Sequence, residues 1–329
     1  MSGWRGNGMA RILARRLLQA VPLLLGVIII NFVLMKCVPG SLLDVMTAEQ
    51  QVTDPALIDR LRALYGLDQP AWLQLLKYIG AVAHLDLGFS YRHNLPVLDV
   101  ILAHLPATLL LMLASIAVAL LVGVGAGVLA AVKVNSGWDT LISALAVLCF
   151  AAPGFWLGIM MIILFSVKLG WFPVGGMQTI GADEGPWGGA LDIARHLVLP
   201  ALTLGLFYAA TYARVMRASM LEIAQLDFVR AARARGLSRF RVITGHMMRN
   251  ALLPVVTLFG LQLGTVLGGS IVVESVFSWP GIGQVLFDSV MSRNFPLVMG
   301  VLVLSSLVVI VVNILVDMIY ARLDPRIGG

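Results

Sequence analysis

The run LPATLLLMLASIAVALLVGVGAGVLAAV, residues 105–132, decides the fold of this chain. It contains no charged residue, and it is longer than the ~20 residues that a helix needs to cross ~30 Å of hydrocarbon at 1.5 Å per residue. A segment in lipid has to satisfy every backbone N–H and C=O within itself, so such a run has to be helical. The run therefore predicts a membrane-spanning helix.

Similar apolar runs recur along the chain of 329 residues, of which 59% are hydrophobic and 12% are charged. A soluble domain carries about twice that charged fraction. The sequence thus predicts an all-α membrane protein, with six transmembrane helices in a single transmembrane domain over residues 1–329. The predicted spans cover residues 17–35, 105–132, 141–167, 197–213, 251–278 and 295–316. Pro153-Gly154 predicts a kink within the third of them.

The formal charge of +6 follows the expected membrane topology. If the N-terminus is cytoplasmic and six spans follow, 15 Lys and Arg residues lie inside and 8 lie outside. Eight of the inside residues fall in the cytoplasmic loop 214–250. This is the positive-inside pattern, so the basic charge does not require a nucleic-acid partner. We expect both termini in the cytoplasm and a long extracytoplasmic loop over residues 36–104.

The long loop contains two predicted short amphipathic helices that would lie at the membrane surface. The first follows Asp54-Pro55, an N-cap and a first-turn proline, and ends at Gly66. The second starts at Gln69-Pro70. Its apolar side chains are Trp72, Leu73, Leu76 and Ile79.

The segment DFVRAARARGLS, residues 227–238, is predicted to be a short helix with defined ends. Asp227 is expected to cap its N-terminus, and Gly236 is expected to adopt the left-handed conformation that ends a helix. Three alanines keep this helix slim: Ala231, Ala232 and Ala234. A slim, capped helix between the fourth and fifth spans is suited to lie in a groove of another protein. The alternative is an ordinary basic loop that obeys the positive-inside rule.

At this segment the chain resembles the integral-membrane subunits of binding-protein-dependent ABC importers. Their shared motif reads Glu-Ala-Ala, three residues, then Gly, and its matching positions here are Arg230, Ala231, Ala232 and Gly236. Because Arg230 replaces the Glu, no ion-pair role of that Glu carries over. Three stretches are similar to the peptide/nickel subfamily: ARARGL (232–237), HMMRNALLP (246–254) and ESVFSWPGIG (274–283).

The resemblance covers nearly the whole chain and is closest to the first permease subunit of dipeptide and oligopeptide importers. It implies a multi-pass protein of the bacterial inner membrane that moves peptides by alternating access. The implied partners are a second related permease, two cytoplasmic ATPase subunits, an extracytoplasmic substrate-binding protein and the lipid bilayer. The resemblance places the ATPase contact at Asp227, Phe228, Arg230, Ala231, Ala232, Arg233, Ala234, Arg235 and Gly236.

Nothing in the sequence indicates chemistry carried out by this chain itself. It contains no Gly-x4-Gly-Lys-Ser/Thr phosphate loop, so ATP and Mg would be bound by the partner ATPase subunits. No catalytic constellation and no metal-ligand spacing emerges, which disfavours an intramembrane hydrolase. Two other functions stay open: a nickel, glutathione or opine importer of the same subfamily, and a secondary transporter or channel that acts alone.

Glu274 is an acid within the fifth predicted span. An ionisable residue inside a span is a candidate for a gate or for the transport pathway. Glu274 also lies only about one helical turn before Ser278, at the end of the span, which fits an interfacial or structural role.

Overall fold

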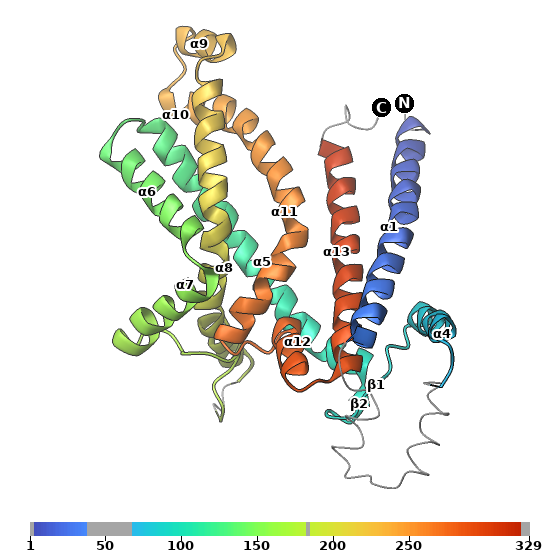
Figure 1. Ribbon diagram of the computed structural model, residues 1–329. Helices are drawn as coiled ribbons and strands as arrows, with labels where there is room; N and C mark the ends of the chain where they lie inside the picture. Colours follow the sequence, from blue (N-terminus) through green and yellow to red (C-terminus); the bar gives the residue numbers. More distant parts are fainter. Residues whose placement is uncertain (1–2, 38–67, 182–184, 324–329) are drawn as a thin grey trace. The chain divides into compact units, whose positions relative to one another are not determined.

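The computed structural model describes residues 3–37, 68–181 and 185–323, which are helical almost throughout (Figure 1). The long helices are α1 (Gly3–Cys37), α5 (Val97–Val132), α8 (Pro186–Ile223), α11 (Met248–Val276) and α13 (Phe295–Leu323). The shorter helices are α4 (Ala71–Ala83), α6 (Gly137–Ala151), α7 (Gly154–Met161), α9 (Asp227–Ala234), α10 (Arg239–Arg241) and α12 (Ile282–Met291). Two segments are π-helical, η1 (Ile162–Lys168) and η2 (Val242–Met247). The strands β1 (Phe89–Ser90) and β2 (Leu95–Pro96) pair antiparallel, with Ser90 opposite Leu95.

Within the described residues, five helices are long and apolar enough to cross a membrane. A sixth span is obtained if α6, α7 and η1 are counted together as one bent helix. The five single spans are Arg15–Cys37, Val97–Val132, Trp187–Ile223, Arg239–Gly260 and Phe295–Val316. The predicted all-α membrane fold is therefore confirmed.

The third predicted span, residues 141–167, is broken near its middle. α6 ends at Ala151, and α7 begins at Gly154 in a direction that differs by 111°. Pro153 occupies the position before α7, and Ala152 has the extended conformation (ψ 133°) that a following proline favours. The expected kinked span is thus two separate helices, joined at the proline.

The internal contacts divide the chain into two compact units, Met1–Leu105 with Val285–Gly329 and Pro106–Gln284. In the first unit α1 packs beside α13, and α4 packs on α1. The Asn294 amide donates to the Ser90 hydroxyl over 2.7 Å, which holds the β1–β2 hairpin to the start of α13. α4 lies where the second surface helix is predicted, whereas the helix predicted after Asp54 lies outside the described residues.

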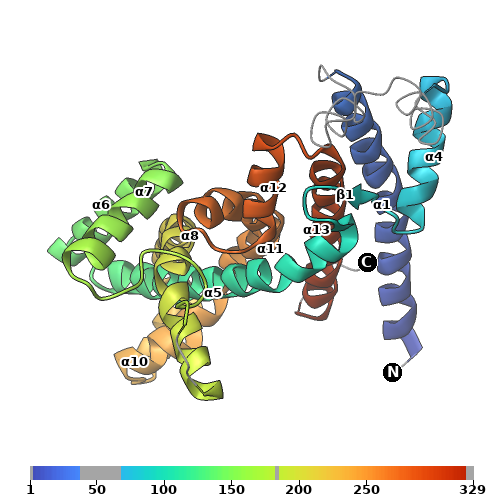
Figure 2. The same ribbon diagram turned by 90° about the horizontal axis from the view of Figure 1, so that it is seen from below.

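In the second unit α8 lies between α6 and α11 (Figure 2). Two glycines of α5 bring that helix close to α8. A β-carbon at Gly123 would lie 2.8 Å from the Ala209 carbonyl oxygen, and one at Gly127 would lie 2.6 Å from that of Ala213. Any larger residue would push the two helices apart, so these glycines set their spacing.

Candidate functional site

α9 is the predicted docking helix, and Figure 1 shows it beyond the last turn of α8. Leu226, and not Asp227, occupies its N-cap position, and no side chain caps it. Asp227 is the first helical residue, lies on the surface and approaches Arg230 at 3.6 Å. The expectation that Asp227 caps the helix is therefore wrong by one position. Its negative charge still lies in the first turn, where the partial positive charge of a helix N-terminus favours it.

The C-terminus of α9 is closed by Gly236, as predicted. Gly236 has φ +76°, in the left-handed region that glycine adopts without steric cost. Its N–H donates to the Arg233 carbonyl at 3.0 Å, and the N–H of Leu237 donates to the Ala232 carbonyl at 3.4 Å. These two bonds form a Schellman motif, which satisfies carbonyl groups that the end of a helix otherwise leaves unpaired.

The two faces of α9 differ in exposure. Val229 and Ala232 are completely buried, because this face packs on η2 within the same chain. Ala232 therefore attaches α9 to its own chain, and it is not part of a surface that a partner could reach. The other candidate residues are exposed: Asp227, Phe228, Arg230, Ala231, Arg233, Ala234, Arg235 and Gly236. The exposed face combines one aromatic side chain, small alanines and several positive charges.

α9 packs on the segment that follows it in the chain, α10 and η2, which we call its seat. Val242 and Met247 of η2 are buried beneath the helix. The guanidinium of Arg239, in α10, donates to the Val132 carbonyl at the end of α5 over 2.9 Å. These contacts attach a helix of only eight residues to the ends of the long helices.

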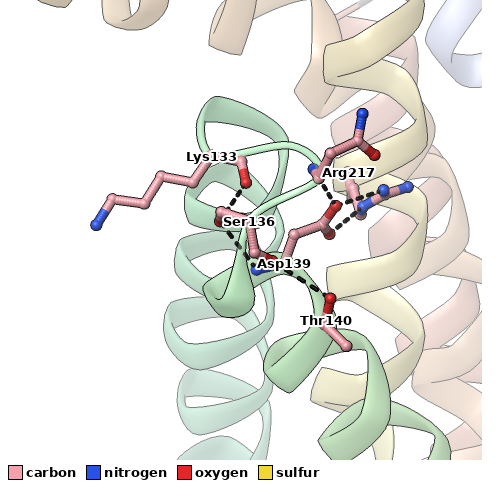
Figure 3. Close-up of polar contacts among 6 residues, drawn as sticks. Lys133, Ser136, Asp139, Thr140 and Arg217 are labelled. Atoms are coloured by element: carbon pink, nitrogen blue, oxygen red, sulfur yellow. Dashed lines mark hydrogen bonds and ion pairs between the residues drawn. The ribbon is translucent and has the colours of Figure 1, made fainter.

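An ion pair fixes the first turn of α6 to α8 (Figure 3). Arg217 donates from Nε to one carboxylate oxygen of Asp139 at 2.7 Å and from Nη2 to the other at 2.8 Å. The Asn135 N–H also donates to Asp139 at 3.0 Å. Asp139 precedes the uncharged run that begins at Leu141, and these hydrogen bonds hold the first turn of α6 against α8.

Glu274, in the last turn of α11, is fully buried and caps the start of another helix. Its Oε1 accepts the Thr108 hydroxyl at 2.9 Å. Its Oε2 accepts the N–H groups of Gly283 at 2.6 Å and Gln284 at 3.2 Å, in the first turn of α12. The Thr108 hydroxyl in turn accepts the N–H of Ile282 at 2.8 Å. Three backbone donors that begin a helix are thus satisfied by two side chains from elsewhere in the chain.

The connection between α11 and α12 closes tightly around this carboxylate. Trp279 is completely buried and donates from its indole nitrogen to the Ala107 carbonyl at 2.9 Å. A β-carbon at Gly281 would lie 2.4 Å from the carboxyl carbon of Glu274, so only glycine fits there. This geometry holds the Trp279–Gly283 connection in one conformation.

Comparison with known proteins identifies the family of this chain. Residues 123–329 match the family described as the binding-protein-dependent transport system inner membrane component. Residues 9–112 match the N-terminal region of such membrane components. This chain belongs to that family. It is a multi-pass inner-membrane transport component, and the resemblance found in the sequence is confirmed.

Relatives of this transport component match it from end to end. The oligopeptide transport system permease protein AppB of Bacillus subtilis is 40% identical over 97% of this chain and 99% of its own length. The di/tripeptide transport system permease protein DppB of Pseudomonas aeruginosa is 41% identical with the same coverage. A solved structure of the MetNI methionine ABC transporter, in an inward-facing conformation, has a TM-score of 0.53 at 20% identity. It covers 69% of this chain and 97% of its own, and it supports the fold alone.

Two residues of the transport component were not singled out in the sequence, Asp139 and Arg217. One signal was available: Ser136 and Asp139 have the three-residue spacing of a capping box just before an apolar run. The structure shows the Ser136 hydroxyl accepting the Asp139 N–H at 3.5 Å. Nothing in the spacing indicated Arg217, which lies 78 positions further along the chain.

Proposed function

We propose that this inner-membrane component is the permease subunit of an ATP-driven importer of dipeptides and oligopeptides. The relatives named as oligopeptide and di/tripeptide permeases support the substrate class, since they align over 97% of the chain. The short helix α9, which Gly236 closes at its C-terminus, lies in a segment that resembles the shared importer motif, and this supports the mode of action. In this proposal the chain lines a path together with a second, related permease.

The ATPase contact is the exposed face of α9. Phe228, Ala231 and the arginines lie on the surface, whereas Val229 and Ala232 hold the helix to its own chain. A movement of the ATPase subunits would therefore be passed to α9 and, through its seat, to the ends of α5, α8 and α11. ATP and Mg would be bound and used on those partner subunits. An extracytoplasmic binding protein would deliver the peptide.

Glu274 acts in this proposal as a positioning residue of the connection between the last two spans. Its carboxylate is fully buried and accepts hydrogen bonds from Thr108, Gly283 and Gln284. These contacts support a role in holding the outer end of the path, and they leave the carboxylate no exposed surface for a substrate. Of the two roles considered from the sequence, we therefore propose that Glu274 maintains the conformation of a gate, and that it does not contact the substrate.

The experiment that tests the ATPase contact compares two Ala→Leu variants in the assembled transporter. Ala231 is exposed on α9, and Ala218 is exposed on α8. We expect Ala231→Leu to leave the permease level unchanged and to abolish ATPase co-purification, because the bulky side chain would not fit between α9 and the groove of the ATPase subunit. Ala218→Leu should behave as the parent protein. Equal ATPase binding by both variants would place the contact elsewhere.

The substrate class is tested separately, by uptake into proteoliposomes that contain both permeases, the ATPases and the binding protein. We expect ATP-dependent accumulation of a labelled dipeptide or oligopeptide. Parallel arms contain nickel and glutathione. Uptake of either of those without uptake of any peptide would contradict the peptide assignment while leaving the importer assignment intact.

A further inference from the structure

A cavity of about 520 Å³ lies beside the C-terminal end of α9, within the second unit. Its walls come from the ends of two long helices, Val132 of α5 and Met220 and Ala224 of α8, and from Ile243 of η2. These side chains are apolar, and Met220 is completely buried. The volume is within the range of pockets that hold a small molecule or part of a larger one.

Two arginines give this apolar cavity a charged rim. Arg233 lies on α9 and Arg239 on α10, and both side chains are exposed on the molecular surface. Arg239 donates to the Val132 carbonyl, which uses one of the five N–H donors of its guanidinium. None of the described residues that line the cavity is acidic. An anionic group at the rim would therefore meet two positive charges.

The position of the cavity along the chain selects its occupant. Val132 ends the uncharged run of the second span, and Lys133 follows it directly. The cavity thus lies at the depth where hydrocarbon gives way to the charged surface of the bilayer. An anionic phospholipid has the matching chemistry, because its phosphate would bind arginines while its acyl chains would contact apolar walls.

We propose that this cavity is a binding site for an anionic phospholipid of the cytoplasmic leaflet. The phosphate lies between Arg233 and Arg239, and the acyl chains run over Ala224 and Ile243. Because Arg233 is part of α9, a bound lipid braces the helix against the ends of α5 and α8. This last consequence rests on the proposed coupling function, whereas the binding itself does not.

The test measures lipid retained by the assembled transporter after gentle extraction, using native mass spectrometry. Transporters are first reconstituted in nanodiscs of phosphatidylcholine that contain phosphatidylglycerol. We expect Arg233→Gln to weaken phosphatidylglycerol binding about fivefold, the effect of one basic residue near an anionic membrane surface. Ala224→Phe fills the cavity without changing any charge, and it should abolish retention of one lipid. The matched control is Arg241→Gln, an exposed arginine of α10 that does not line the cavity.

Each outcome decides the assignment. Loss of one lipid in Ala224→Phe and weaker binding in Arg233→Gln, with parental binding in Arg241→Gln, supports the site. Parental binding in both cavity variants overturns it, and so does equal retention of phosphatidylcholine and phosphatidylglycerol. Displacement of the lipid by millimolar glycerol phosphate would show an anion site without acyl contacts, which also overturns the lipid assignment. ATPase co-purification reports the coupling function separately when it is measured on Ala224→Phe, because Ala224 is not part of the proposed ATPase contact, whereas Arg233 is.

Discussion

Replacement of Gly236 tests whether the closed end of α9 is needed for coupling. The residue has φ +76°, and apart from its two neighbours in the chain no described residue has a heavy atom within 4 Å of the position that a β-carbon would take. A substitution there meets open space, so its cost is confined to the backbone. For a β-branched residue the left-handed conformation costs about 1–2 kcal/mol. A change of that size shifts the population of a structured state by a factor of about 5–30.

α9 has little capacity to absorb this cost. It has eight residues, and isolated helices of that length are unstable in water. Its C-terminal turn depends on the bonds that the N–H groups of Gly236 and Leu237 donate. We therefore expect Gly236→Val to fray the helix and to lower substrate-stimulated ATP hydrolysis by about fivefold or more. Since the segment lies in a loop between spans, the permease level in the membrane should be unchanged.

Gly236→Asn is the matched control. Asparagine also adds a side chain, but it adopts the left-handed region far more readily than valine does. ATP hydrolysis in Gly236→Asn should stay near the parental rate, with normal ATPase co-purification. If the Val and Asn variants lose activity equally, bulk and not backbone conformation is responsible. If neither loses activity, the geometry of this helix end is not part of coupling.

Three further predictions concern other parts of the chain. Glu274→Leu should lower the unfolding temperature in detergent, because the Thr108 hydroxyl and the N–H groups of Gly283 and Gln284 lose their acceptor, at about 1–3 kcal/mol for each buried donor; an unchanged temperature would contradict the buried geometry. A double-mutant cycle of Asp139→Asn with Arg217→Gln, measured from unfolding temperatures in detergent, should give a favourable coupling energy, because two hydrogen bonds of 2.7 and 2.8 Å join the two side chains; additive effects of the two substitutions would contradict the pairing. A reporter fused after Gly236 should be cytoplasmic and one inserted near Asp86 external, and an external signal at Gly236 would refute the predicted topology.

The parts of the fold that depend on composition and local geometry could be predicted from the sequence. Long uncharged runs have one stable conformation in lipid, so the all-α membrane fold could be predicted from them. Gly236 was placed correctly because a left-handed residue after a helix is strongly selective for glycine. Asp227 was placed one position too early, since N-cap and first-turn positions both favour acidic side chains and the sequence does not separate them.

The parts that depend on contacts between distant segments could not be predicted. Thr108 and Glu274 are 166 positions apart, and neither has a local pattern that indicates the other. The sequence predicted that Ala232 lies in a slim, alanine-rich helix, but it did not indicate which face of the helix is buried. Only the packing of α9 on η2 shows that Ala232 is on the buried face. Pro153 indicated a kink, but the 111° angle between α6 and α7 also depends on α8 and α11, on which α7 packs.

The length of α8 has a mechanical consequence. The helix runs unbroken for 38 residues, about 57 Å at 1.5 Å per residue, and α9 begins shortly after its end. At Gly123 and Gly127 the backbone of α5 lies directly against Ala209 and Ala213 of α8, so a tilt of α8 would carry α5 with it. Pro200 lies inside this helix. If the turns on the two sides of Pro200 stay in line, a tilt of about 5° about one end of α8 would move its other end by about 5 Å. A small rotation at the far end of α8 would then displace α9 by nearly a full turn of helix.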